Sequence, residues 1–125
     1  MKTKDYSGIR SDGPLPSCLE VQIPEDIGDM LGDYIDSCTS QLEELEPAVL
    51  VYESDNNDVE NCANIRRILH KIKSEASMMG FEDIAALFHE AESAFEELDK
   101  KAGIEMLLRL KDWTLAAMQN MKREI

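Results

Sequence analysis

The stretch from Arg66 to Phe81, "RRILHKIKSEASMMGF", decides the fold of this 125-residue chain. Apolar residues recur in it at spacings of three and four, which is the period of a helix with one buried face. Extended toward the N-terminus, this apolar stripe comprises Cys62, Ile65, Ile68, Leu69, Ile72, Ala76 and Met79. Gly80 suits the left-handed position that follows a helix, and Phe81 can fold back onto the last turn. The pattern therefore predicts a helix that begins near Asp58 and ends at Gly80.

The same helical period recurs on both sides of this stretch and predicts helices over residues 24–46, 82–98 and 104–122. Pro47 should disturb the end of the first, although residues 48–50 could continue it after a kink, and "DKKAG" breaks the pattern before the last. The expected core faces hold Ile27, Met30, Leu31, Tyr34, Ile35, Cys38, Leu42 and Leu45, then Ile84, Leu87, Phe88, Ala91, Phe95 and Leu98, then Met106 or Leu107, Leu110, Trp113, Leu115, Ala117, Met118 and Met121. Four amphipathic helices with short connections predict an all-α, up-and-down antiparallel four-helix bundle.

The N-terminal residues 1–24 contain two glycines, three prolines and little periodicity. That composition predicts a partly irregular leader or linker, so we divide the chain into a leader over residues 1–24 and a bundle over residues 25–125. The alternation in "CLEVQIP" (18–24) would allow a short strand, but we expect this piece to pack loosely or to act as a tether. The N-terminus lacks the apolar segment of a signal peptide, and no run reaches the roughly 20 apolar residues of a membrane span.

The chain is strongly acidic, with 26 Asp and Glu against 13 Lys and Arg, a net charge of −13 and a pI near 4.4. Such a surface repels phosphate backbones and anionic lipids, so we expect neither nucleic-acid nor membrane binding. It would accept a protein partner that presents a basic surface.

The three cysteines, Cys18, Cys38 and Cys62, are widely spaced and form no CxxC or Cys/His cluster. No metal site is therefore expected. We interpret them as reduced thiols of a cytoplasmic protein, with Cys38 and Cys62 buried.

His70 does not lie on the apolar stripe of its helix. A projection at about 100° per residue places it among cationic and small side chains. These neighbours are Ala63, Arg66, Arg67, Lys73, Ser74 and Ser77. Positive charge at this place disfavours the imidazolium form and favours an anion. One interpretation is a solvated surface histidine. The other, which the gathering of cations in an acidic chain favours, is a neutral ring that accepts a phosphoryl group.

The helix predicted over residues 82–98 carries the second histidine, within "LFHEAESAF". His89 and Glu92 are three residues apart, so they share a face, and that face lies beside the apolar one. Both side chains could therefore turn toward the helix predicted over residues 58–80. On this stretch alone, a solvated polar edge is the better interpretation.

The stretch around His70 resembles the motif of histidine-containing phosphotransfer (HPt) domains. That motif has a histidine, an apolar residue two positions on, a lysine three on, a small residue four on, and then a small residue and a glycine before a turn. His70, Ile72, Lys73, Ser74, Ser77 and Gly80 occupy these positions. "LFHEAESAFEEL" (87–98) resembles the next helix of one branch, the N-terminal phosphoacceptor domain of the chemotaxis histidine kinase CheA. That branch carries a histidine and a glutamate at the spacings of His89 and Glu92. The resemblance covers about residues 25–123.

The resemblance implies a role for each of these side chains. His70 would accept the phosphoryl group, Glu92 would orient its ring, Lys73 would offset the phosphoryl charge, and His89 would complete the hydrogen-bond network. The expected partner-binding residues are Arg66, Arg67, Ser74, Ser77 and Met78. Ser74 stands where the family usually has glycine, so its hydroxymethyl group could narrow the approach of a partner.

The resemblance also implies the partners, a histidine kinase as donor and the receiver domain of a response regulator as acceptor. The chain would be a monomeric phosphoryl carrier without a cofactor or metal rather than an autonomous enzyme, either stand-alone or a fragment of a CheA-type kinase. Two alternatives stay open, an acidic helical adaptor in which His70 is incidental and a degenerate HPt fold without transfer. A ferritin-like di-iron site is excluded because Arg67 and Ala86 stand where its glutamates would be.

Overall fold

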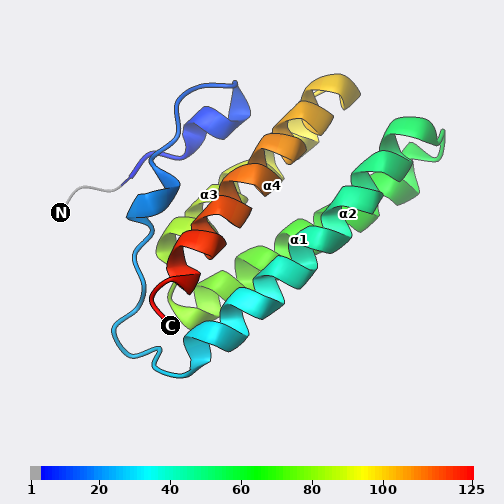
Figure 1. The fold of residues 1–125 in the computed structure, drawn as a ribbon. Coiled ribbons are helices and arrows are strands. Elements are labelled where there is room, and N and C mark those ends of the chain that lie inside the picture. Colours follow the sequence, from blue (N-terminus) through cyan, green and yellow to red (C-terminus); the bar gives the residue numbers. More distant parts are fainter. Residues whose placement is uncertain (1–3) are drawn as a thin grey trace.

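The computed structural model describes residues 4–125 and is a bundle of four helices (Figure 1). The elements are η1 (Ser7–Arg10) and η2 (Cys18–Glu20), both 3-10 turns, followed by α1 (Met30–Ser54), α2 (Asp58–Met79), α3 (Glu82–Glu97) and α4 (Lys100–Lys122). Around one core, α1 lies beside α2 and α4, and α3 lies beside the same two helices. Residues 4–125 contain no strand. The predicted all-α, up-and-down bundle is confirmed.

The C-terminal end of α2 has the structure predicted from its sequence. Gly80 follows Met79 with φ of +86°, a backbone conformation that favours glycine. The Phe81 N–H donates to the Ala76 carbonyl at 2.8 Å, and the Gly80 N–H donates to the Ser77 carbonyl at 3.2 Å. These two bonds form a Schellman motif. Because only Gly80 and Phe81 separate α2 from α3, the two helices are antiparallel neighbours.

Helix α1 differs from the prediction at both ends. Gly28 has φ of +53°, which no α-helix accommodates, so the helix begins at Met30 instead of residue 24. At the other end it continues through Pro47 to Ser54. Pro47 cannot donate to the carbonyl of Glu43, but both residues are exposed, so water can bond that carbonyl. Beyond the proline the helix buries Ala48, Val49 and Tyr52.

Helix α4 begins at Lys100, earlier than predicted, because Asp99 is its N-cap. The Asp99 carboxylate accepts a hydrogen bond from the Ala102 N–H at 2.8 Å, which satisfies one of the free donors of the first turn. The predicted core faces are largely confirmed. Met30 is the clear error, since it is 54% exposed. Cys62, Met79, Leu98, Trp113 and Leu115 are only partly buried.

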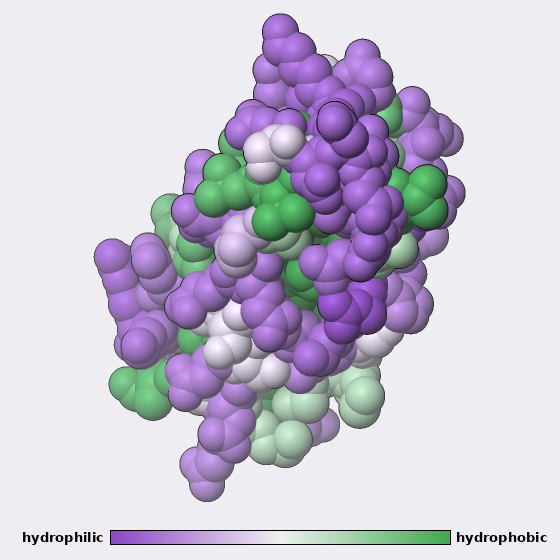
Figure 2. All heavy atoms as spheres, turned by 90° about the vertical axis from the view of Figure 1, so that its right-hand side faces the viewer, coloured by the Kyte–Doolittle hydropathy of each residue, from purple (hydrophilic) through white to green (hydrophobic). Residues whose placement is uncertain are grey.

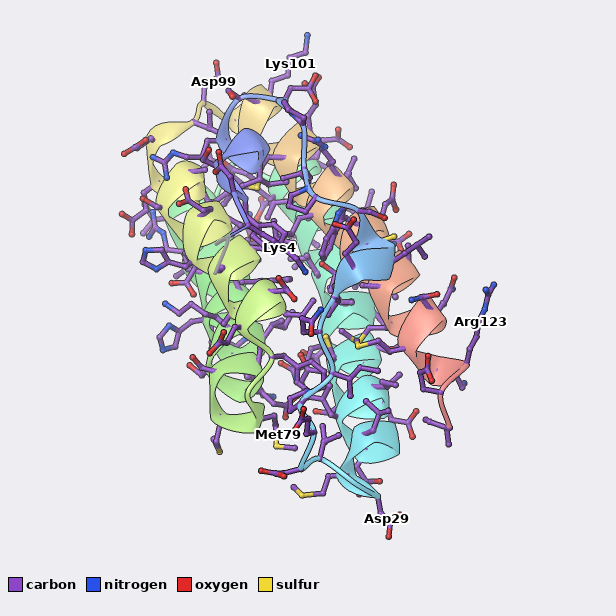
Figure 3. The ribbon with its side chains drawn as sticks, turned by 90° about the vertical axis from the view of Figure 1, so that its left-hand side faces the viewer. Lys4, Asp29, Met79, Asp99, Lys101 and Arg123 are labelled. Carbon is purple, nitrogen blue, oxygen red and sulfur yellow. The ribbon has the colours of Figure 1, made fainter. Side chains whose placement is uncertain are left out.

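The segment before α1 packs against α3 and α4 (Figures 1 and 3), so the expectation of loose packing was wrong. Tyr6, Ile9 and Val21 are buried. The Asp83 carboxylate, in the first turn of α3, accepts hydrogen bonds from the Tyr6 hydroxyl at 3.0 Å and from the Gln22 backbone N–H at 2.9 Å. The alternation in residues 18–24 forms no strand, and η2 occupies its start.

Two side chains of α4 hold the same N-terminal segment by donating hydrogen bonds to the backbone carbonyl groups of that segment. Trp113 Nε1 donates to the Pro16 carbonyl at 2.9 Å, and Arg109 Nη2 donates to the Gly13 carbonyl at 2.5 Å. The Tyr6 ring meets the Trp113 ring edge-on, with centroids 5.7 Å apart. Trp113 is therefore not a core residue of the bundle but one that fastens the segment to it.

Hydrophilic side chains cover most of the surface seen in Figure 2, and apolar side chains appear between them in separate patches. This distribution fits the high content of charged residues. Among residues 4–125 no helix combines the length and the apolar character needed to cross a membrane.

Cys38, on α1, should resist thiol reagents in the folded protein. Its side chain is buried, and burial raises the pKa of the thiol to about 12, so its reactive thiolate is scarce near pH 8. Cys18 and Cys62 are partly exposed, which corrects the prediction that Cys62 is buried. In a titration with a coloured disulfide reagent, we expect only these two thiols to react before denaturant is added. Cys38→Ala should remove the slow thiol alone, and three equally fast thiols would contradict this packing.

Candidate functional site

His70 lies on α2 and points away from the core. Its side chain is 65% exposed, while Leu69 and Ile72 on either side of it in the sequence are buried. The helix is therefore anchored by its apolar stripe, and the imidazole stands on the opposite, polar face. The orientation predicted for His70 is confirmed.

Glu92 of α3 faces the ring of His70. Its Oε1 lies 3.5 Å from His70 Nδ1, slightly beyond the usual length of an N–H···O hydrogen bond. Lys73 Nζ lies 3.4 Å from each of the two carboxylate oxygens. Oε1 is buried and has no hydrogen-bond partner among the described residues. A small shift of the imidazole would give this oxygen its missing donor, the N–H at Nδ1.

The tight turn at Gly80 and Phe81 explains why these three side chains meet. His70 and Glu92 lie at similar distances along the chain from that turn, on two antiparallel helices. Buried Phe88, Ala91 and Phe95 fix the rotation of α3, and this rotation turns Glu92 toward α2. The spacing of residues along one helix could not predict the distance between His70 and Glu92, because that distance depends on how α2 packs against α3.

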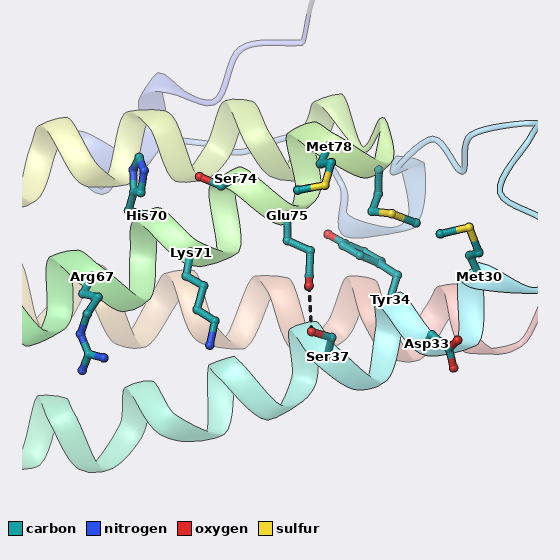
Figure 4. A pocket seen from close by; sticks show the side chains of 11 residues that line it. Met30, Asp33, Tyr34, Ser37, Arg67, His70, Lys71, Ser74, Glu75 and Met78 are labelled. Carbon is teal, nitrogen blue, oxygen red and sulfur yellow. Dashed lines mark hydrogen bonds between the residues drawn. The ribbon is translucent and has the colours of Figure 1, made fainter.

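A groove of about 700 Å³ opens between α1 and α2 and begins at His70 (Figure 4). Arg67 and Lys71 lie beside His70 at one end. Met30 and Asp33 of α1 lie at the other. Sequence reasoning missed this groove, because it assigned Met30 to the core and gave Lys71 no role. A signal was present, since Arg67, Lys71, Ser74 and Met78 form a second row at helical spacing.

A cluster of polar side chains joins α2 to α1 at the groove, which Tyr34, Ser37 and Glu75 line. The Glu75 carboxylate accepts hydrogen bonds from the Ser37 hydroxyl at 3.0 Å and from Gln41 Nε2 at 3.1 Å. Two buried oxygens of the same region, Tyr34 Oη and Gln41 Oε1, have no hydrogen-bond partner among residues 4–125. Burial raises the pKa of Tyr34 well above its usual range, so its hydroxyl stays protonated.

Comparison with known families adds to this geometry. The sequence model of the Hpt domain matches residues 29–121, which is most of the chain and covers all four helices except the last residue of α4. The chain belongs to the Hpt domain family. No solved structure matches it significantly. Membership of this family implies histidine phosphotransfer in phosphorelay signalling. The likeness to the CheA branch stays a prediction.

The second histidine of this Hpt domain is His89. His89 is exposed on α3, and its ring makes no hydrogen bond or ion pair with the described residues. The predicted place of His89 in a hydrogen-bond network around His70 therefore stays a prediction.

The residues expected to bind the partner of this Hpt domain all lie at the surface. Arg66, Arg67, Ser74, Ser77 and Met78 are exposed. Arg67 donates a hydrogen bond to the Asn64 side chain, which holds its guanidinium near the start of the row. Met78 is 81% exposed, so it does not fill the core. Within residues 4–125, no three His, Cys, Asp or Glu side chains gather as metal ligands would.

Proposed function

We propose that His70 accepts a phosphoryl group on Nε2 from a histidine kinase and passes it to an aspartate of a receiver domain. The observation that carries this proposal is the position of Glu92 Oε1, which lies 3.5 Å from Nδ1 of an otherwise exposed imidazole. This oxygen is buried and pairs with Lys73 at 3.4 Å, but it accepts no hydrogen bond from the described residues. A solvated surface histidine would need no such carboxylate. A histidine that accepts a phosphoryl group needs one ring nitrogen held by a hydrogen bond and the other free to attack phosphorus.

Each transfer exchanges one bond to phosphorus for another. When Nδ1–H donates to Glu92, the lone pair of the ring lies on Nε2. That lone pair forms the new bond to phosphorus while the bond to the donor's leaving atom breaks. In the second step, a carboxylate oxygen of the receiver's aspartate forms its bond to phosphorus, and the bond to Nε2 breaks. The imidazole returns to its starting state.

Glu92 acts as a positioning residue, because its carboxylate fixes the tautomer of His70 and makes Nε2 more electron-rich. Lys73 offsets the negative charge of Glu92 and can reach toward phosphoryl oxygens, since it lies on the same turn of α2 as His70. His89 would extend this network if its exposed ring turned toward Glu92.

The remaining machinery of transfer belongs to the partners. Phosphoryl transfer depends on positioning and on Mg²⁺ to stabilise charge, and the kinase and the receiver domain would supply both. We therefore propose a carrier without a cofactor of its own, acting as a monomer in the cytoplasm in a chemotaxis-like or other two-component pathway.

The proposal is tested by labelling the protein from a histidine kinase and ATP, or from phosphoramidate without a kinase. We expect one phosphoryl group per chain, labile in acid and stable in base, that maps to His70. A receiver domain with Mg²⁺ should then remove it. The adaptor alternative predicts no label from either donor, and that result would overturn the proposal.

Glu92→Gln should lower the rate of labelling by phosphoramidate about 10-fold, because the neutral amide is a weaker acceptor for Nδ1–H and stabilises the ring less. NMR of the imidazole nitrogens should show a reduced fraction of the Nδ1–H tautomer. The thermal midpoint should hardly change.

Glu90→Gln is the matched control for that experiment. It makes the same change on the same helix, but Glu90 pairs with Arg10 at 3.4 Å and not with His70. It should label at the wild-type rate. Equal rates for both variants would show that Glu92 does not position the ring.

A further inference from the structure

We propose that the N-terminal segment, residues 4–24, takes part in phosphoryl acceptance, because it holds α3 in the position that brings Glu92 to His70. Tyr6 and Ile9 of this segment are then positioning residues, which act through Glu92 and not on the imidazole itself. The inference rests on the proposed function and assigns it residues outside the Hpt-domain match of residues 29–121. Three features of the structure support it.

The first feature is the face of α3 that the segment covers. Asp83, Glu90 and Glu97 are seven residues apart, so they form one stripe along α3, and each accepts a hydrogen bond from the segment. At about 100° per residue, Glu92 lies about 180° around the helix from Asp83. The segment, which lies against α3 and α4 in Figure 3, therefore backs α3 on the side away from Glu92.

The second feature is a buried carboxylate that binds the segment. Asp83 is 8% exposed, and its carboxylate accepts hydrogen bonds from the Tyr6 hydroxyl at 3.0 Å, the Gln22 N–H at 2.9 Å and Lys4 Nζ at 3.3 Å. Lys4 and Tyr6 lie at one end of the segment and Gln22 lies at the other. Removal of these donors would leave a buried charge without partners, which is costly. The first turn of α3 is therefore firmly attached to both ends of the segment.

The third feature is the attachment of the same segment to α4. η1 contacts both α3 and α4, and its Ile9 is 2% exposed. Trp113 of α4 donates to the Pro16 carbonyl at 2.9 Å and meets the Tyr6 ring edge-on. Because the segment bridges α3 and α4, α3 cannot move away from α2 without breaking these contacts.

Small movements of α3 matter at this site. Glu92 Oε1 lies 3.5 Å from His70 Nδ1, at the upper limit of a hydrogen bond. A shift of α3 away from α2 by a fraction of an ångström would therefore leave the ring without its orienting carboxylate.

The ion pairs of the segment contribute less than its buried side chains. Arg10 pairs with Glu90 and Glu97, but all three side chains are accessible to solvent, which screens their charges. Glu90→Gln therefore remains a valid control for Glu92→Gln. The effect on Glu92 depends on buried Tyr6 and Ile9.

The test removes these two buried side chains and measures labelling by phosphoramidate, which needs no docked protein. At a temperature well below its thermal midpoint, Tyr6→Ala/Ile9→Ala should accept label about 3-fold more slowly than wild type, because Glu92 is displaced. NMR of the imidazole nitrogens should show a smaller fraction of the Nδ1–H tautomer. Circular dichroism should show that the helices are intact.

The same two substitutions in the Glu92→Gln background separate positioning from stability. Labelling should slow no further there, because no carboxylate remains to be positioned. The thermal midpoint should fall in both backgrounds, since the same buried contacts are lost in both.

Tyr6→Phe is the matched control. It keeps the ring that packs against Trp113 and removes only the hydroxyl, while Lys4 and Gln22 still donate to Asp83. It should label at the wild-type rate.

Two results would overturn the inference. Equal labelling rates for wild type and Tyr6→Ala/Ile9→Ala would show that these side chains do not position Glu92. Equal slowing in both backgrounds would assign the effect to stability alone. Tyr6→Ala by itself makes the same comparison with a smaller loss of packing, and the same outcomes apply to it if the double variant does not fold. Failure of wild type to accept label at all would instead overturn the proposed function.

Discussion

We expect His70→Gln to take up essentially no phosphoryl label, with incorporation below about one hundredth of wild type. Glutamine has a similar reach and can still hydrogen-bond Glu92, but its amide nitrogen has no free lone pair to attack phosphorus. The fold should be intact, because a 65% exposed side chain contributes little to the core, and surface changes usually alter stability by less than about 0.5 kcal/mol. Labelling from phosphoramidate and the thermal midpoint measure the two effects separately.

His89→Gln is the control, since it removes the other histidine of the chain from an exposed site on α3. It should retain label in full or lose only part of its rate if His89 assists Glu92. Label on His70→Gln at the wild-type level, or its complete loss in His89→Gln, would show that the acceptor has been assigned to the wrong residue.

The parts of the fold that follow from local chemistry were predictable from the sequence. The spacing of Ile68, Leu69, Ile72 and Ala76 sets the buried face of α2 and thereby the exposure of His70. Gly80 determines where α2 ends, because few other residues accept its positive φ. Both features depend on neighbours within one helix, and a single sequence contains that information.

The parts that depend on contacts between distant segments were not predictable in the same way. Whether Met30 is buried depends on how far α1 and α2 diverge at their ends, and the helical period is the same in either case. The N-terminal segment packs because Asp83 and Trp113 offer it a carboxylate and an N–H, and the positions of these groups are known only after α3 and α4 are placed. The helix continues through Pro47 because the carbonyl group that loses its donor there faces solvent, and the sequence does not show which side of the helix faces solvent.

The candidate site combines both kinds of information. Periodicity places His70 and Lys73 on one face, but the approach of Glu92 requires the turn at Gly80 and Phe81. The resemblance to HPt domains had already predicted that Glu92 lies beside His70. Neither the helical period nor the resemblance predicted that α1 contributes residues to the groove. Asp33 and Tyr34 belong to no motif around His70.

Phe81→Ala should destabilise the bundle strongly, with an expected loss of about 3–5 kcal/mol in the free energy of unfolding. The Phe81 side chain is fully buried in the turn between α2 and α3 and stacks on Tyr34 of α1 at an interplanar angle of 8°. Its removal leaves a cavity where three helices meet and ends a stacked contact that is worth more than its buried area alone. Thermal unfolding followed by circular dichroism should show a midpoint lower by roughly 10–20 °C.

Phe81→Leu is the control that separates volume from chemistry, because it fills most of the cavity and should cost only about 1 kcal/mol. If both variants melt at the wild-type midpoint, the turn does not hold α1 and α2 together. Below its midpoint Phe81→Ala should still accept label from phosphoramidate, because His70 and Glu92 belong to the well-packed middle of α2 and α3. The same variant would leave the ring of Tyr34, which lines the groove between α1 and α2, without its stacking partner.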